Sequence, residues 1–315
     1  MSPFSTTRCA RSTVDDRDDT LRSHARRGGC PEIVVARHAG YCYGVERALR
    51  LTEEAVRTAE GPVATLGPII HNPTVVRRLE ERGARMVEDV AHASEGTLVV
   101  RTHGVPPEAV GEARRRGLHV VDATCPFVAV AQRKAAELRE AGYLVVILGE
   151  RDHPEVVGLQ GFAGPEAVVV EGADGLRPAL VRGRRVGVVV QTTQSREHLA
   201  EVVAALAPLA RETLVFNTIC DATEKRQTAA CELAGQVDAV VVVGGRNSAN
   251  TARLAQLCRE IEPRTFHIET AAELRPEWVR GCRRIGVTAG ASTPEDEIEA
   301  TIRALERLCE PAAGE

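Results

Sequence analysis

The 315-residue sequence lacks three features, each of which marks a large class of proteins. No apolar run approaches the roughly 18 residues that a membrane-spanning helix needs. The formal net charge of −4 gives no excess of positive charge for binding a nucleic-acid backbone. No CxxC pair occurs among the nine cysteines, which argues against a zinc ribbon, a thioredoxin-like redox pair and a ferredoxin run. These absences favour a globular protein without a membrane or nucleic-acid partner.

Residues 1–30 show almost no periodic apolar pattern and carry six arginines against four aspartates. Such a composition predicts a disordered N-terminal extension. The acidic DDRDD argues against a transit peptide, and there is no apolar core of a secretory signal. We therefore expect a cytoplasmic protein. Nine cysteines, an odd number, do not suggest a disulfide scaffold, so any special cysteine is expected to bind a metal or to act in catalysis.

From residue 31 onward, runs rich in Val and Ile alternate with amphipathic helical patterns. Helices are predicted at 44–59 and at 126–142, the second ending on Gly142 as its C-cap. Continuous β-branched runs suit strands that are covered on both faces, so the alternation predicts mainly parallel α/β sheets. The predicted strands are 32–36, 97–101, 119–123, 143–149, 167–171, 185–191, 239–245 and 284–290.

Three cysteines, Cys42, Cys125 and Cys220, stand where a strand ends and a helix begins. They are 83 and 95 residues apart, which suggests three similar α/β units, at 31–125, 126–217 and 218–315. Each alone would more often be a small buried residue than a ligand, but the three together favour a shared ligand set. Three thiolates could hold a four-iron cluster with one open iron, or zinc with a water; the spacing does not decide between them. We interpret the other six as packing or incidental residues.

Polar loops follow the strands, where parallel sheets bind ligands. His38 fits an ordinary surface position, whereas His71, His103 and His153 each follow an apolar run. NSAN at 247–250 and GASTP at 290–294 add hydroxyls and an amide, although Ser248 and Ser292 could be ordinary N-caps. Histidines, hydroxyls and helix N-termini together would make a diphosphate site.

Nine motifs, in this order and spacing, resemble the LytB/IspH family. The resemblance covers about residues 32 to 310, and it is specific because many short motifs agree in order. The motifs are GYCYGVERAL, HNPTVVRRLEERGA, THGV, DATCP, HPEVVG, QTT, ICDAT followed by RQ, NSAN and GVTAGASTP.

The resemblance implies a monomeric or dimeric iron–sulfur oxidoreductase with three α/β units around a central cluster. Its reaction would be the reductive dehydroxylation of (E)-4-hydroxy-3-methylbut-2-enyl diphosphate to isopentenyl and dimethylallyl diphosphate. This is the last step of the methylerythritol phosphate route to isoprenoids. The expected partners are the small diphosphate substrate and an electron donor such as ferredoxin or flavodoxin.

The matching motifs also imply the site residues. Cys42, Cys125 and Cys220 would hold a 4Fe–4S cluster whose fourth iron stays open to the substrate hydroxyl. Glu155 and Thr192 would form the proton-delivery network beside that hydroxyl. The substrate would be bound by His71, His103, His153, Thr192, Ser248, Asn250 and Ser292.

One departure from the family's pattern falls in the expected diphosphate site. The family usually has two serines in NSSN, and here Ala249 replaces the second, which predicts substrate binding weaker by at most one hydrogen bond. The departure leaves room for a paralogue with altered substrate. A zinc hydrolase lacks a familiar ligand spacing here, and a non-catalytic iron–sulfur sensor would not require Glu155 and Thr192. We therefore expect the reductase.

Overall fold

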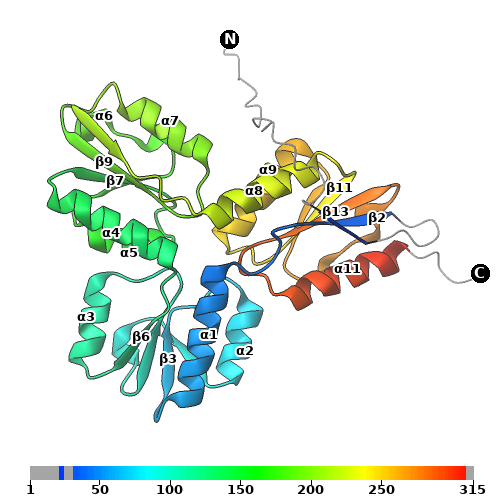
Figure 1. Cartoon of the computed structure of the whole chain (residues 1–315), viewed down its shortest axis with the longest axis horizontal. Helices are drawn as coiled ribbons and strands as arrows, with labels where there is room; N and C mark the ends of the chain where they lie inside the picture. Colours follow the sequence, from blue (N-terminus) through cyan, green and yellow to red (C-terminus); the bar gives the residue numbers. More distant parts are fainter. Residues whose placement is uncertain (1–20, 25–30, 310–315) are drawn as a thin grey trace, which may run out of the picture.

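Three separate β-sheets surround a common centre (Figure 1). The computed structural model describes residues 21–24 and 31–309, with the backbone alone described at 21–24 and 309. The predicted class, α/β with three parallel-sheet units, is confirmed. No helix within these residues has the length and apolarity that a membrane crossing requires.

Unit 1 contains a four-stranded parallel sheet in the order β4-β3-β5-β6. Val99 and Val63 of its central strands pack with residues of α1, so the sheet and helix share one apolar core. Its strands are β3 (Val63–Leu66), β4 (Ala84–Val87), β5 (Thr97–Val100) and β6 (His119–Asp122). Its helices are α1 (Tyr43–Thr58), α2 (Pro73–Glu81) and α3 (Pro107–Arg115), with a short 3-10 turn at Val90–His92.

Unit 2 contains a second parallel sheet, in the order β10-β9-β7-β8. Every residue of β7 is buried, as expected of a strand covered by helices on both faces. Its strands are β7 (Leu144–Leu148), β8 (Val168–Val170), β9 (Arg185–Val190) and β10 (Glu212–Val215). Its helices are α4 (Pro126–Glu140), α5 (Pro154–Ala163), α6 (Pro178–Val181) and α7 (Arg196–Leu206), with a 3-10 turn at Ala173–Gly175.

Unit 3 contains five strands in the order β1-β2-β13-β11-β12. Only β1 runs antiparallel to its neighbour. The strands are β1 (Leu21–His24), β2 (Glu32–Ala36), β11 (Ala239–Val243), β12 (Thr265–Ile268) and β13 (Arg284–Ala289). The helices are α8 (Asp221–Ala234), α9 (Ala249–Ile261), α10 (Pro276–Val279) and α11 (Glu295–Cys309), with a 3-10 turn at Ala271–Glu273.

Two predictions about the first part of the chain need correction. The predicted unit 31–125 assigned residues 32–36 to unit 1, but β2 pairs with β13 and so belongs to the sheet of unit 3. Within the predicted disordered extension 1–30, residues 21–24 form β1 on the edge of that sheet. Residues 1–20 and 25–30 lie outside the described part of the chain. The remaining unit boundaries stay predictions.

Five strands were missing from the sequence interpretation: β1, β3, β4, β10 and β12. Each is four residues long, and β4, β10 and β12 lie at sheet edges. Short edge strands carry polar residues on their open side, so they lack the continuous apolar run that revealed the central strands.

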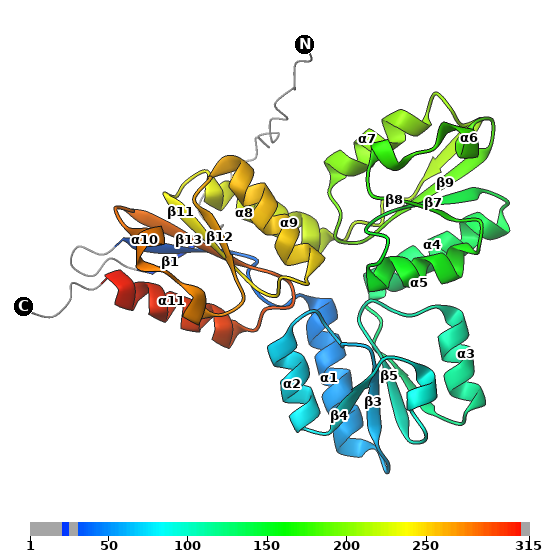
Figure 2. The ribbon, with the colours of Figure 1, turned by 180° about the vertical axis from the view of Figure 1, so that it is seen from behind.

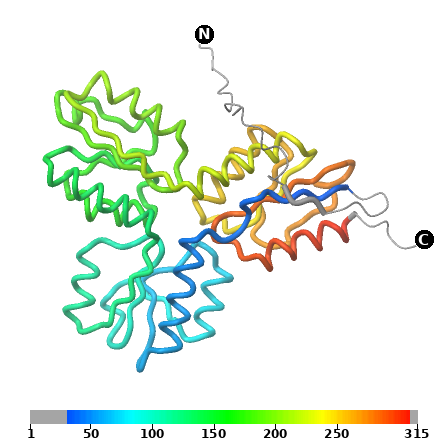
Figure 3. Tube along the Cα trace, in the orientation of Figure 1, coloured from blue at the N-terminus to red at the C-terminus, as the bar shows by residue number. Residues whose placement is uncertain are grey.

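The chain passes from one unit to the next at each of the three cysteines (Figure 3). Cys42 lies between β2 of unit 3 and α1 of unit 1. Cys125 lies between β6 of unit 1 and α4 of unit 2, and Cys220 between β10 of unit 2 and α8 of unit 3. The three helices that follow begin near the centre (Figure 1). Seen from behind, α2, α5 and α9 also point their first turns inward (Figure 2).

Candidate active site

Each of the three cysteines is the N-cap of a helix: Cys42 of α1, Cys125 of α4 and Cys220 of α8. We call these three residues the cysteine site. They line one cavity. A helix N-terminus carries partial positive charge and unpaired N–H groups, which stabilise a thiolate. At Cys220 this is visible, because the N–H of Thr223 donates to Sγ at 3.3 Å and the Thr223 hydroxyl lies 3.1 Å from it.

Gly44 allows two of these sulfurs to approach each other. A Cβ at this position would lie 2.5 Å from the Sγ of Cys125 and 3.9 Å from the Sγ of Cys42. The first distance is well inside van der Waals contact, so with any side chain at residue 44 either α1 or the sulfur of Cys125 would have to shift. The glycine in the YCYG sequence is therefore a packing requirement of the site.

The protonation state of the cysteine site depends on whether a cation is bound. Burial raises the pKa of the Cys125 thiol to about 11 and raises the pKa of Cys220 as well. Both thiols are therefore protonated at neutral pH, whereas metal ligands must be thiolates. A bound metal reverses this balance because its charge stabilises the thiolate.

Arg226 supplies a buried positive charge beside the same sulfurs. Its side chain is 4% exposed, lines the cavity and donates to the carbonyl of Gly40 at 2.8 Å. Burial lowers its pKa, while Cys42 and Cys220 in the thiolate form raise it. No carboxylate pairs with it among the described residues, and its Nε has no partner. A buried cation needs a negative partner, and cysteine thiolates would provide it. The residues present therefore fit an anionic metal–thiolate group.

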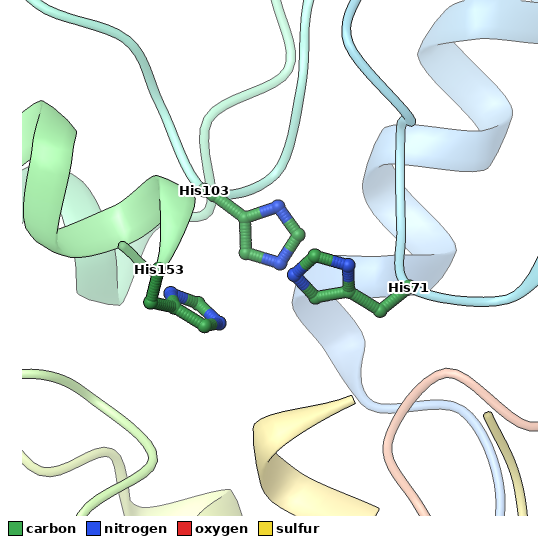
Figure 4. A group of neighbouring side chains, drawn as sticks. All are labelled: His71, His103 and His153. Atoms are coloured by element: carbon green, nitrogen blue, oxygen red, sulfur yellow. The ribbon is translucent and has the colours of Figure 1, made fainter. Parts of the chain in front are cut away.

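Three histidines form a second group in the cavity: His71 before α2, His103 after β5, and His153 at the start of α5 (Figure 4). Their ring centroids lie 4.3 to 5.4 Å apart. Burial, assisted by the charge of Arg101, lowers the pKa of His71 to about 4. Burial also lowers the pKa of His153 to about 3 and that of His103 well below its usual value. All three rings are neutral at pH 7 in the free protein.

One nitrogen from each ring could in principle bind a common metal ion, because these atoms lie within 4.8 Å of one another. The hydrogen bonding of His153 argues against this use. Its Nδ1 accepts the backbone N–H of Glu155 at 3.1 Å, so the proton of the neutral ring is on Nε2. A metal-binding imidazole does the opposite and donates its second N–H to an acceptor. The His153 ring is therefore arranged to donate a hydrogen bond from Nε2.

Unit 3 adds further polar groups from two loops. Ser248 is the N-cap of α9, because its side chain accepts the N–H of Thr251. The Asn250 Oδ1 accepts the N–H of Ala291 at 3.0 Å, while its Nδ2 is buried without a partner. The Ser292 hydroxyl donates to the carbonyl of His71 at 3.2 Å. Both nitrogens of His71 are likewise buried and unpaired. We call His71, His103, His153, Ser248, Asn250 and Ser292 the polar site.

Glu155 and Thr192 form a closed pair in the same cavity. The Thr192 N–H donates to Oε1 of Glu155 at 2.6 Å, and its hydroxyl donates to Oε2 at 2.8 Å. The Glu155 side chain is 1% exposed, and burial raises the pKa of its carboxyl to about 7 despite these two hydrogen bonds. A carboxyl with such a pKa can hold and release a proton near neutral pH.

All eleven predicted site residues line this one cavity, which holds about 700 Å³ including space open to solvent. Sequence reasoning missed Arg226, Gly44 and Arg101. The last stands two residues before His103 in RTHGV and is the charge that acts on all three histidines. Its position directly after β5, at the ligand-binding edge of the sheet, could have identified it as a site residue.

Comparison with known proteins gives the family. The profile described as LytB protein matches residues 33–306. The chain belongs to the LytB family.

Two curated members illustrate the relation of this LytB chain to known sequences. It is 44% identical over 282 residues to the 4-hydroxy-3-methylbut-2-enyl diphosphate reductase of Aquifex aeolicus, covering 89% of this chain and 97% of the relative. It is 50% identical over 278 residues to the same enzyme of Geobacter sulfurreducens, covering 88% and 98%.

Two solved structures share the LytB fold. One is (E)-4-hydroxy-3-methyl-but-2-enyl diphosphate reductase, described as the terminal enzyme of the non-mevalonate pathway; it is 45% identical, with a TM-score of 0.66, and the match covers 87% of this chain and 99% of that one. The other is the E-1-hydroxy-2-methyl-but-2-enyl-4-diphosphate reductase of Plasmodium falciparum, 27% identical with a TM-score of 0.78 and 86% coverage of each chain.

Proposed function

We propose that this chain reduces (E)-4-hydroxy-3-methylbut-2-enyl diphosphate to isopentenyl and dimethylallyl diphosphate, the last step of the methylerythritol phosphate route. The observation that carries the proposal is the joining, in one cavity, of three cysteine-capped helices, an uncharged polar site and a carboxyl with a pKa of about 7. The names of the relatives agree with this activity.

Cys42, Cys125 and Cys220 would hold a 4Fe–4S cluster, leaving one iron without a protein ligand. When bound, the cluster supplies two electrons and a Lewis-acidic iron for the substrate hydroxyl. The protein's own contribution is to hold the three sulfurs at helix N-termini and to place the buried charge of Arg226 beside them.

The polar site would bind the diphosphate. Its unpaired donors, the single N–H of the neutral His71 ring and the Nδ2 of Asn250, are buried and available for an anion. The first turns of α5 and α9 add N–H groups, which favour negative charge. Each charge-assisted hydrogen bond contributes about 1.5–3 kcal/mol, so several together can fix the substrate.

Glu155 would give the proton that lets the hydroxyl leave as water. The reaction breaks a C–O bond, forms a C–H bond and consumes two electrons and two protons, while the diphosphate is unchanged. Because burial raises the pKa of Glu155 to about 7, its carboxyl can hold this proton at neutral pH and release it to the substrate. Thr192 positions both carboxyl oxygens. We also propose a cytoplasmic location and an electron-carrier protein as donor.

Anaerobic purification followed by metal and turnover assays tests the proposal. We expect about four irons and four sulfides per chain and conversion of the hydroxymethylbutenyl diphosphate with dithionite-reduced methyl viologen. A protein that carries zinc, or that carries the cluster but leaves the substrate unchanged, contradicts it.

A further inference from the structure

Asn72, directly after His71, makes more hydrogen bonds than a helix cap requires. It is the N-cap of α2, and its Oδ1 accepts the N–H of Val75 at 3.1 Å. Because a backbone N–H can be accepted by the amide oxygen but not by the amide nitrogen, this bond fixes the orientation of the side chain. The residue is 3% exposed, so its Nδ2 group must find acceptors inside the protein.

Both acceptors belong to unit 3, at positions 220 and 225 residues later in the chain. The Nδ2 of Asn72 donates to the carbonyl of Ser292 at 3.1 Å and to Oε2 of Glu297 at 3.3 Å. Ser292 lies in the GASTP loop, and Glu297 lies in the first turn of α11, which begins beside the start of α2 (Figure 2). One amide therefore caps α2 and also joins it to the loop that carries a polar-site residue.

A second hydrogen bond crosses the same boundary in the opposite direction. The Ser292 hydroxyl donates to the carbonyl of His71, so two consecutive residues of unit 1 are each bonded to Ser292. A hydroxyl has a single proton, so Ser292 can donate to a bound diphosphate only by releasing the His71 carbonyl. The Asn72 amide then still holds the two loops together, because its donors point to the Ser292 carbonyl and to Glu297 and not into the cavity.

The other contacts between these loops and helices do not replace this amide. Arg78 of α2 pairs with Asp296 of α11 at 2.7 Å, but the two side chains are 46% and 55% exposed, and ion pairs in water contribute little. The N–H of Cys42 donates to the carbonyl of Ala291 at 3.3 Å, which joins the GASTP loop to the start of α1 and not to α2. The buried Asn72 amide therefore sets the place of α2 relative to this loop.

We propose that Asn72 is a positioning residue for diphosphate binding, which keeps His71 of unit 1 and Ser292 of unit 3 at the separation that one ligand bridges. The inference rests on the proposed function, which assigns the diphosphate to the polar site. Groups that are held in place before the ligand arrives need less ordering on binding. Loss of the amide should therefore weaken binding of the diphosphate more than it lowers kcat.

Replacement of the amide by a hydroxyl tests the cross-unit contact separately from the cap. Asn72→Ser keeps a favoured N-cap but removes the group that reaches unit 3. Asp89→Ser is the matched control, because Asp89 caps the 3-10 turn of unit 1 by accepting the N–H of Ala91. We measure the Kd of inorganic pyrophosphate by calorimetry on the anaerobic, cluster-loaded protein, together with steady-state kinetics.

For Asn72→Ser we expect Kd and substrate KM to rise about tenfold and kcat to change less than about threefold, since a hydrogen-bonded donor to an anion is misplaced. For Asp89→Ser we expect a change in Kd of less than about twofold, since capping affects local stability and not the polar site. Equal changes in Kd for the two variants overturn the inference.

A rescue experiment separates positioning from a general loss of structure. Asn72→Asp keeps the cap but places a carboxylate beside that of Glu297, so its Kd should rise at least as much as that of Asn72→Ser. Adding Glu297→Gln restores the original net charge, and the glutamine amide then donates to the new carboxylate. We expect the Kd of this double variant to return to within about threefold of the wild-type value, since the two positions are coupled.

Glu297→Gln alone shows whether the rescue is more than an effect of charge. It keeps an acceptor for the Asn72 amide and should not tighten pyrophosphate binding. Tightening as large as the rescue, or a double variant that binds no better than Asn72→Asp, overturns the inference. The double variant also decides the question if Asn72→Ser does not fold.

Turnover of the wild-type protein with methyl viologen separates this inference from the proposed function. A protein that binds pyrophosphate but does not convert the substrate contradicts the proposed function, while its Kd values still test Asn72. Normal wild-type turnover with an unchanged Kd and KM in Asn72→Ser leaves the proposed function intact and overturns the inference. A wild-type protein that does not bind pyrophosphate overturns the inference as well.

Discussion

The cysteine site and the polar site are built in the same way, but they differ in whether their side chains are ready to bind a ligand in the free protein. Both are built at helix N-termini around one cavity. The polar site has neutral rings and unpaired donors, so its groups are in the form that binds an anion before any ligand arrives. The cysteine site has thiols whose pKa burial raises, so it takes its working form only with a metal group. The polar site is therefore ready in the folded chain alone, whereas the cysteine site needs its metal group to be inserted.

The largest expected effect comes from removing one sulfur. Cys125→Ser should lose iron and lower the turnover rate. Mutating a residue that only supports a metal ligand costs roughly 10- to 100-fold, so removing a ligand itself should cost more. Binding of inorganic pyrophosphate should persist, because the polar site does not need the metal. Iron analysis and calorimetry measure the two effects. Cys282→Ser, a half-buried cysteine beside β13, is the control, and equal iron content in both variants would contradict the comparison.

Glu155 is expected to set the pH dependence. Burial raises its pKa to about 7, so the acid form is present below that pH, and kcat/KM should fall about tenfold per pH unit above it. Glu155→Gln should remove this limb and lower kcat by about 10²–10⁴. Glu150→Gln, at an exposed position five residues earlier, should retain the limb but move it to lower pH, because the charge of Glu150 contributes to the raised pKa of Glu155. A Glu155→Gln variant with full turnover would exclude the residue from proton transfer.

Gly44→Ala should damage the cysteine site without removing a sulfur. The new methyl carbon would lie 2.5 Å from the Sγ of Cys125, so α1 or that sulfur must shift, and either movement distorts the ligand set. We expect iron to be lost to a chelator about 10- to 100-fold more readily, with pyrophosphate binding unchanged. Gly111→Ala in α3, where the nearest atom belongs to a flexible arginine, is the matched control. Indistinguishable chelation curves would show that the close approach does not matter.

The smallest expected effect concerns the polar site. Ala249 is the first residue of α9 and lines the cavity. Ala249→Ser restores a hydroxyl there and should lower KM about two- to tenfold, since a net hydrogen bond contributes about 0.5–1.5 kcal/mol. kcat and iron content should not change. Ala252→Ser, exposed on the same helix, provides the baseline for steady-state kinetics. An unaltered KM would mean that the existing donors already satisfy the diphosphate.

The sequence predicted the central strands other than β3, together with site residues that stand directly after strands, because continuous β-branched runs end at the ligand-binding edge of a sheet. It could not predict the place of β2, which pairs with β13 about 250 residues later, since no local pattern encodes such a pairing. The roles assigned to the eleven cavity residues stay predictions until they are tested.

Residues that act through burial were missed for a related reason. Arg226 looks like an ordinary exposed arginine in DATEKRQ and is buried only because α8 directs its first turns into the centre. Gly44 looks like a helix-weakening residue, and its purpose is clear only from the sulfur of Cys125, at the start of α4, which lies close beside it. Both depend on tertiary contacts that composition and periodicity do not contain.

The chain crosses between units at the cysteines, and this has a mechanical consequence. A group bonded to all three sulfurs would link the three junctions between units at one point and close chain loops of 83 and 95 residues. Closing long loops restricts the unfolded chain, as other cross-links do. Oxidative loss of such a group would therefore loosen the arrangement of all three units at the same moment that it ended the chemistry, making damaged molecules easier for proteases to recognise.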